Sequence, residues 1–144
     1  MIAVDTNLLV YAHRTDSPFH ESASSLVRGL AEGRARWTIP WPVAHEFLAI
    51  VTHPKIYRPP TPMPIAVGQL QAWLSSPSVV VIHEGPGYLD VLSELCASGR
   101  IVGPAVHDAR IASLCLFHGV DELWSADRDF TRFPRLRTRN PLTL

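Results

Sequence analysis

The stretch MIAVDTNLLVYA, residues 1–12, places an acidic residue directly behind a short apolar run. Residues 2–4 (IAV) have the composition of a β-strand, so Asp5 stands where that strand would end. A carboxylate in this position is either a solvated strand end or one wall of a site. The acids farther along the chain decide between these two interpretations.

Short β-type runs alternate with longer segments of helical periodicity along the chain. The runs are IAV at residue 2, WTI at 37, VVVI at 79 and ELW at 122. The helical segments cover residues 20–33, 43–54, about 65–75, 87–99 and 103–119, and proline-dense residues 53–64 form an irregular, exposed connector. This alternation predicts βαβ units, a mainly parallel sheet and a single α/β domain over residues 1–144.

The charge balance gives little indication of a partner. Thirteen basic and thirteen acidic side chains cancel, which argues against a protein that coats nucleic acid or a membrane surface through net charge. Five arginines nevertheless crowd the last seventeen positions: Arg128, Arg132, Arg135, Arg137 and Arg139. This tail either binds phosphates, for which arginine is well suited, or is a solvated basic end.

Cellular location is indicated by the cysteines and by the start of the chain. Cys96 and Cys115 show neither CxxC spacing nor a disulfide framework, and both are expected to be buried thiols in a reducing compartment. The first residues lack a signal-peptide pattern, and no stretch approaches the roughly 20 apolar residues of a membrane span. We therefore expect a soluble cytoplasmic protein that makes no membrane contact.

Glu46 is the most informative acid, because it lies on the same helical stripe as Val43, Phe47 and Ile50. Burying an unpaired carboxylate is costly, so this position implies a nearby cation, a protonated acid or an edge that reaches solvent. An edge glutamate or a salt bridge to arginine would also account for it.

Three further acids follow helix and strand signals. Asp108 falls in the first turns of the helix over 103–119, where the helix dipole favours negative charge, and Ala109 and Ala112 with Ala105 give that helix a small-residue face. Asp127 and Asp129 come directly after the ELW strand, although each could simply cap a short helix at DFTRF.

Taken together, these acids can converge at the carboxyl ends of the strands, where ligands bind in open α/β sheets. Carboxylates so crowded would repel one another unless a divalent cation neutralised them. All of the donors are hard oxygens, which favours Mg²⁺ or Mn²⁺ over zinc. Such an ion can activate water and stabilise charge on a phosphoryl oxygen without a covalent nucleophile.

Four spaced segments carry a family resemblance: VDTNLLVYA, HEFLAIVTHP, VHDARIASLCLFHGVDELWSADRDF and FPRLRTRNPL. In this order, over nearly the whole chain, they resemble the PIN-domain ribonucleases of the VapC toxin type. The resemblance implies a single three-layer α/β/α PIN-like domain whose acidic, Mg²⁺- or Mn²⁺-dependent site cleaves RNA. It also implies a homodimer and a cognate VapB-type antitoxin that blocks the site.

The resemblance also assigns roles by position. Asp5, Glu46, Asp108 and Asp127 take the catalytic and metal-binding places, and Asp129 is a second candidate for the last of these. Ser125 stands where many relatives have Thr, so the hydroxyl is kept. Thr6 and Asn7 would orient Asp5 or a phosphate, yet both are also ordinary residues for a strand-to-helix turn.

Other functions fit less well. HEFLA begins like a zinc-protease motif, but Ala49 replaces the required second histidine. VHDA is similar to the paired His-Asp of helical HD-type metal phosphohydrolases, which the strand-like runs oppose. A calcium loop lacks its later ligands, and an aspartyl phosphatase would need an acid where Asn7 stands. A catalytically inert PIN-fold module that only binds a partner remains the main alternative.

Overall fold

Five strands form one sheet in the order β3-β2-β1-β4-β5. The computed structural model describes residues 1–143. Its strands are β1 (Ile2–Val4), β2 (Trp37–Pro40), β3 (Val79–Ile82), β4 (Glu122–Trp124) and β5 (Thr138–Arg139). Every pairing between these strands is parallel, which confirms the predicted parallel sheet and opposes the all-helical HD-type alternative. The sequence did not predict β5, a two-residue edge strand.

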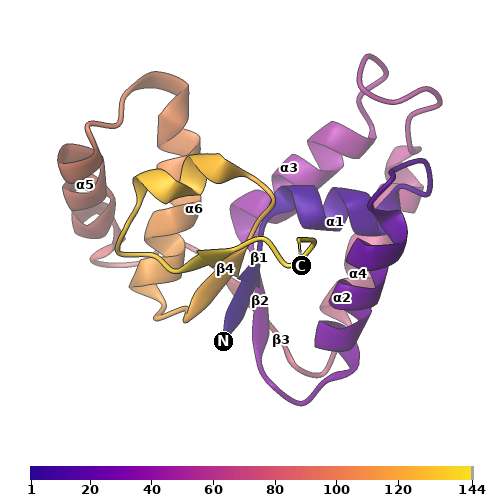
Figure 1. Cartoon of the computed structure of the whole chain (residues 1–144), viewed down its shortest axis with the longest axis horizontal. Coiled ribbons are helices and arrows are strands. Elements are labelled where there is room, and N and C mark those ends of the chain that lie inside the picture. Colours follow the sequence, from indigo (N-terminus) through magenta and orange to yellow (C-terminus); the bar gives the residue numbers. More distant parts are fainter. Residues whose placement is uncertain (144) are drawn as a thin grey trace.

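Helices cover both faces of the sheet, as the three-layer α/β/α prediction requires. Figure 1 shows α1, α2 and α4 on one side and α5 and α6 on the other. Helix α3 follows β2 directly and contacts α1, α4 and α6. The bounds are α1 Thr6–His13, α2 His20–Glu32, α3 Trp41–Val51, α4 Met63–Leu74, α5 Tyr88–Gly99 and α6 Val106–Phe117, with 3₁₀ turns η1 Gly103–Ala105 and η2 Arg128–Arg132.

Several helix ends differ from the sequence prediction. Helices α3 and α4 each begin two residues earlier than expected, because Pro42 and Pro64 sit in their first turns, where the missing N–H is not needed. Gly99, expected to terminate α5, is its last helical residue, and Arg100 follows with a positive φ of 52°. The short helix expected at DFTRF is a 3₁₀ helix, and Asp127 caps it as the sequence allowed, because its Oδ1 accepts from the backbone N–H of Asp129 at 2.8 Å.

The proline-rich connector is less exposed than predicted. Its Thr61 is buried and its Tyr57 is half-buried, because Arg14 at the end of α1 holds the segment. The Arg14 Nη1 donates to the carbonyl oxygen of Pro59 at 3.0 Å and to Thr61 Oγ1 at 3.1 Å. Its guanidinium also lies 4.2 Å from the centre of the Tyr57 ring, within the range of a cation–π contact.

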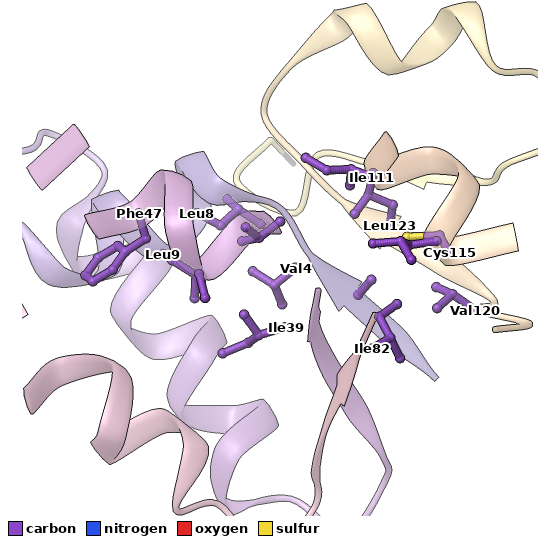
Figure 2. Close-up of a cluster of buried hydrophobic side chains, with 14 of the residues drawn as sticks. Val4, Leu8, Leu9, Ile39, Phe47, Ile82, Ile111, Cys115, Val120 and Leu123 are labelled. Atoms are coloured by element: carbon purple, nitrogen blue, oxygen red, sulfur yellow. The ribbon is translucent and has the colours of Figure 1, made fainter. Parts of the chain in front are cut away.

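The core fills both sides of the sheet. Figure 2 shows Leu9 and Phe47 on one side of β1 and Ile111, Cys115 and Leu123 on the other. The two central strands β1 and β2 are almost continuously buried, as expected for strands covered on both faces.

The prediction of two buried thiols is half right. Cys115 is buried among the side chains of the α6 face, and burial raises the pKa of its thiol to about 12. Cys96 is only half-buried, because it lies on α5, a helix at the outside of the fold. Both cysteines are free, as expected.

The fold brings the ends of β1 and β4 together. Val4 is paired with Trp124, and the backbone N–H of Asp5 donates to the Trp124 carbonyl at 2.9 Å. Asp5 and Ser125, the residues that follow the two strands, therefore lie side by side at the carboxyl edge of the sheet. Within residues 1–143, no helix combines the length and apolarity required of a membrane span.

Candidate metal centre and active site

Asp5 is a buried carboxylate at the centre of the carboxyl edge. Only 5% of its surface is exposed, and Ser125 Oγ donates to its Oδ2 at 2.6 Å. Burial raises the pKa of Asp5 to about 6, the Ser125 bond opposes that rise, and the charges of Glu46 and Asp127 add to it. The solvated strand-end interpretation is therefore excluded, because Asp5 faces other acids inside the protein.

Glu46 reaches the same place from α3. On the apolar stripe of α3, Val43, Phe47 and Val51 are buried. Glu46 and Ile50 lie at the edge of this stripe and are half-buried. Thr6 Oγ1 donates to Glu46 Oε2 at 2.7 Å, and no arginine among residues 1–143 forms a salt bridge with it. The Thr6 side chain thus orients Glu46, while a hydrogen bond from the Thr6 backbone acts on Asp5 and opposes the rise of its pKa.

A cluster of three acids lies across from these residues. Asp108 is in the first turn of α6, and Asp127 and Asp129 are at the start of η2. One carboxylate oxygen from each lies within 4.8 Å of the other two. Burial and the charges of Asp127 and Asp129 raise the pKa of Asp108, while nearby Arg132 partly opposes the rise.

Arg132 is the cation beside this cluster. Its Nη2 lies 3.5 Å from Asp108 Oδ2 and 3.8 Å from Asp129 Oδ2, and all three side chains are at least partly exposed. The sequence placed Arg132 only within a basic tail, and no spacing rule connects it to Asp108, 24 positions earlier.

Asn7 and Ser125 connect the two groups of acids. The Ser125 hydroxyl, besides donating to Asp5, accepts from the backbone N–H of Asp127 at 2.9 Å and from Asn7 Nδ2 at 3.5 Å. Asn7 Oδ1 accepts from the backbone N–H of Ala126 at 3.2 Å. These bonds fix the direction in which the chain leaves β4, and therefore the position of Asp127.

Four of the five predicted acids line one open pocket of about 300 Å³. We call it the acidic pocket; its acids are Asp5, Glu46, Asp108 and Asp127. Asp129 belongs to the three-acid cluster but does not line the pocket. The pocket is also lined by the apolar and aromatic residues Val10, Tyr11, Ile50 and Tyr57, of which the sequence had indicated only Ile50, as part of the Glu46 stripe.

The donors fit a small divalent cation. They are carboxylate oxygens, the ligands that Mg²⁺ and Mn²⁺ prefer, and the described cluster contains no thiolate or imidazole that would favour zinc. The raised pKa values of Asp5 and Asp108 show that the crowded, partly buried anions lack sufficient compensation within the protein itself. A cation would supply that compensation.

The whole chain matches known proteins. A family model described as the PIN domain matches residues 2–136. The Mycobacterium tuberculosis protein named ribonuclease VapC48 is 34% identical over 139 residues, which cover 96% of each chain. The Mycobacterium bovis protein named VapC ribonuclease Mb2897 is 33% identical over 142 residues, covering 99% of this chain and 96% of the relative.

Solved structures share the fold. VapBC2 from Rickettsia felis, crystallised with a DNA fragment from its promoter, aligns with a TM-score of 0.70 and 22% identity over 96% of this chain and 98% of that one. Mycobacterium tuberculosis VapC20, described as a toxin that cleaves the sarcin-ricin loop, aligns with a TM-score of 0.68 and 17% identity over 91% of this chain and 93% of that one.

Proposed function

Because the chain belongs to the PIN-domain family, we propose that it is a Mg²⁺- or Mn²⁺-dependent endoribonuclease, the toxin of a type II toxin–antitoxin pair. Relatives that align over nearly their full length are named VapC ribonucleases. The observation that carries the proposal is the acidic pocket, where acids from β1, α3, α6 and the end of β4 meet.

Asp5, Asp108 and Asp127 would hold the cation, with Asp129 as a further ligand. A bound cation would supply Lewis-acid charge for activating water and for stabilising a phosphoryl oxygen. Asp5 is held by Ser125 before any ligand arrives, so its carboxylate needs no reorganisation. Thr6 donates to Glu46 Oε2, so Glu46 Oε1 would be available to accept a proton from an attacking water.

The apolar side of the pocket gives the RNA a surface. Tyr57 is held by Arg14, and Tyr11 packs against Phe19 with ring centres 5.1 Å apart. Aromatic rings placed beside a phosphate site suit the bases of an unpaired strand, which stack on such side chains. Single-stranded RNA is therefore the proposed substrate.

The direct test is cleavage of RNA by the purified protein. We expect cleavage with Mg²⁺ or Mn²⁺, none with EDTA, and loss of cleavage in Asp108→Asn. Sequencing the 5′ ends of RNA fragments after a pulse of expression would identify the substrate. If highly purified protein leaves total cellular RNA intact with either metal, the proposed function is wrong.

The inert-module alternative makes a different prediction about metal binding. A module that only binds a partner needs no cation, so neither Mg²⁺ nor Mn²⁺ should change its unfolding temperature. Our proposal predicts stabilisation by both ions, because a ligand that binds only the folded state favours it. The stabilisation should be smaller in Asp108→Asn and unchanged in Asp90→Asn, an exposed acid on α5.

We also propose that the protein forms a homodimer and binds a VapB-type antitoxin. Of the four tryptophans, Trp37 and Trp73 are buried in the core. Large apolar side chains do remain exposed, among them Trp41 (41%), Leu89 (71%) and Val102 (79%). Light scattering of the free protein and co-purification with the product of a neighbouring small gene would test the two interactions.

The antitoxin would block the site by charge. An antitoxin Arg or Lys placed near Asp5, Glu46 and Asp108 would provide the compensation that a cation otherwise provides. Inhibition in the purified complex should then weaken as Mn²⁺ rises, and weaken further when that basic residue is changed to Ala. If the Ala substitution left inhibition unchanged at every Mn²⁺ concentration, the antitoxin would block the site sterically and not by charge.

A further inference from the structure

The structure divides the five C-terminal arginines into two groups. Three lie beside acids of the protein. Arg132 is next to Asp108 and Asp129, and Arg135 Nη1 lies 3.7 Å from Glu94 Oε1. Arg137 is close enough to Asp121 that its charge helps to lower the pKa of that carboxyl.

The other two, Arg128 and Arg139, line a separate pocket of about 220 Å³, which we call the arginine pocket. Within residues 1–143, neither guanidinium forms a salt bridge or a hydrogen bond. Arg14 at the end of α1 illustrates the opposite case, an arginine whose guanidinium donors are already used, by Asp16, Pro59 and Thr61. The arginine pocket therefore holds two cations whose donors face solvent.

The arginine pocket adjoins the acidic pocket. Asp127 lines both, and Ser125, which lines the arginine pocket, donates its hydroxyl to Asp5. The two pockets thus share the short segment that follows β4. A ligand that extends out of the acidic pocket past Asp127 would enter the arginine pocket next.

The remaining groups of the arginine pocket suit an anion with several oxygens. Asn140 Oδ1 accepts from the backbone N–H of Leu142 at 3.0 Å, which leaves the Asn140 amide nitrogen to donate. Thr138 adds a hydroxyl, whereas the Thr131 hydroxyl is already used by the carbonyl of Arg128 at 2.8 Å. Among the residues that the structure describes around this pocket, two guanidinium charges face one carboxylate, that of Asp127, and the forked donors of arginine match phosphate oxygens.

We propose that the arginine pocket binds a backbone phosphate of the RNA strand, beside the phosphate that is cleaved in the acidic pocket. Arg128 and Arg139 are the ligands, with Asn140 and Thr138 as additional donors. This inference rests on the proposed ribonuclease function for the identity of the strand. It adds the direction in which the strand leaves the site, along the end of β4 toward β5.

The test separates binding from cleavage. In an Asp5→Asn background, which should not cleave, the affinity for a fluorescein-labelled pool of random RNA 12-mers is measured by anisotropy across a salt series. Arg128→Gln/Arg139→Gln should weaken binding by at least about tenfold, the scale of losing charge-assisted hydrogen bonds. The slope of log affinity against log salt should become shallower by about 0.7, the value for one single-strand phosphate.

Two matched variants make the result specific. Arg135→Gln/Arg137→Gln removes the same charge outside the pocket and should bind RNA nearly as the parent does. Arg128→Lys/Arg139→Lys should keep the salt slope but recover only part of the affinity, because lysine lacks the planar fork. Unfolding temperatures of all variants establish that they are folded.

Equal losses in the two Gln double variants would overturn the proposal, because total charge would then explain the binding. Unchanged RNA binding in Arg128→Gln/Arg139→Gln would overturn it too. If that variant also lost a co-purified antitoxin, the pocket would belong to a protein partner. RNA cleavage is measured separately with Arg128 and Arg139 intact, so a failure to cleave would count against the proposed function alone.

Discussion

The two walls of the acidic pocket are built in different ways. The β1 wall consists of Asp5, Thr6 and Glu46, and its carboxylates are held by protein hydroxyls at 2.6 and 2.7 Å. The α6 wall consists of Asp108 and Asp127, and Asp129 beside it completes the three-acid cluster; of these three acids only Asp108 is half-buried. Arg132, which forms ion pairs with Asp108 and Asp129, lies 3.5 Å or more from their carboxylate oxygens.

The two walls therefore prepare for a charged ligand differently: the β1 wall holds its carboxylates fixed, and the α6 wall leaves its carboxylates in contact with solvent. In the β1 wall, burial and short hydrogen bonds fix the carboxylates before binding, at a cost to the ionised protein. In the α6 wall, solvent screens the charges, so crowding costs less and the side chains keep more freedom. The β1 wall should therefore dominate stability and its pH dependence, while both walls contribute to metal binding.

The largest expected effect follows from changing the most buried acid. Asp5→Asn keeps the shape and can still accept from Ser125, but removes a charge needed to hold a cation. RNA cleavage should fall by at least about 100-fold, the scale of losing a preorganised electrostatic contact at a reacting centre. Cleavage is measured on the same RNA for Asp90→Asn, which should behave as wild type. Wild-type rates in Asp5→Asn would remove Asp5 from the site.

The pH dependence of metal-free stability should report the same residue. Since the pKa of Asp5 is about 6 in the folded protein and 3.8 as a free group, ionisation favours the unfolded chain. The protonated Asp5 carboxyl contributes fully to the free energy of unfolding below about pH 4. This contribution is lost as pH rises through about 6, and the free energy of unfolding changes by up to about 3 kcal/mol. Urea denaturation in EDTA from pH 4 to 7 should show this decline in wild type and a smaller decline in Asp5→Asn, where the raised pKa of Asp108 remains. If the free energy of unfolding changed with pH in the same way in wild type and in Asp5→Asn, the raised pKa of Asp5 would be contradicted.

Ser125→Ala should destabilise the protein by about 1–3 kcal/mol, because it leaves Asp5 without its hydroxyl donor and the Asp127 N–H without its acceptor. Ser125→Thr keeps the hydroxyl and should recover most of this loss. Ser98→Ala, an exposed hydroxyl on α5, provides the control. If the free energy of unfolding of Ser125→Ala near pH 7 equalled that of wild type, Ser125 would not be holding the β1 wall.

The smallest effect is expected at Glu46, which solvent reaches. Glu46→Gln relieves like-charge repulsion on Asp5 and Asp108, so the metal-free protein should melt at an equal or slightly higher temperature, by less than about 1 kcal/mol. The stabilisation gained on adding Mn²⁺ should shrink. A large loss of metal-free stability would instead make Glu46 a structural residue.

Sequence reasoning succeeded where a local pattern determines structure. The runs at 2, 37, 79 and 122 became strands, and helical periodicity placed Glu46 beside an apolar stripe. It failed where long-range contacts decide. The strand β5 exists because it pairs with β4, and Tyr57 turns inward because Arg14 holds the connector, two effects that residue spacing does not encode.

The candidate site divides in the same way. The sequence indicated the acids, because Asp5, Asp108 and Asp127 stand at strand or helix ends and Glu46 lies on an apolar helical stripe. Which acid each hydroxyl holds was not predictable, since Thr6 meets Glu46 across 40 positions and Ser125 meets Asp5 across 120. The ranking of Asp127 above Asp129 is still a prediction, to be tested by comparing Mn²⁺ binding in the two Asn variants.

The bond between Ser125 and Asp5 also bears on how the protein is made. A ribosome synthesises Asp5 first and Glu46 next, whereas Ser125, Asp127 and β4, which pairs with β1, follow only some 120 residues after Asp5. Until Asp108 has been made, a nascent chain therefore carries at most two of the four acids of the acidic pocket. For the proposed ribonuclease, this order of synthesis would leave the acidic pocket incomplete until Asp127 has been made.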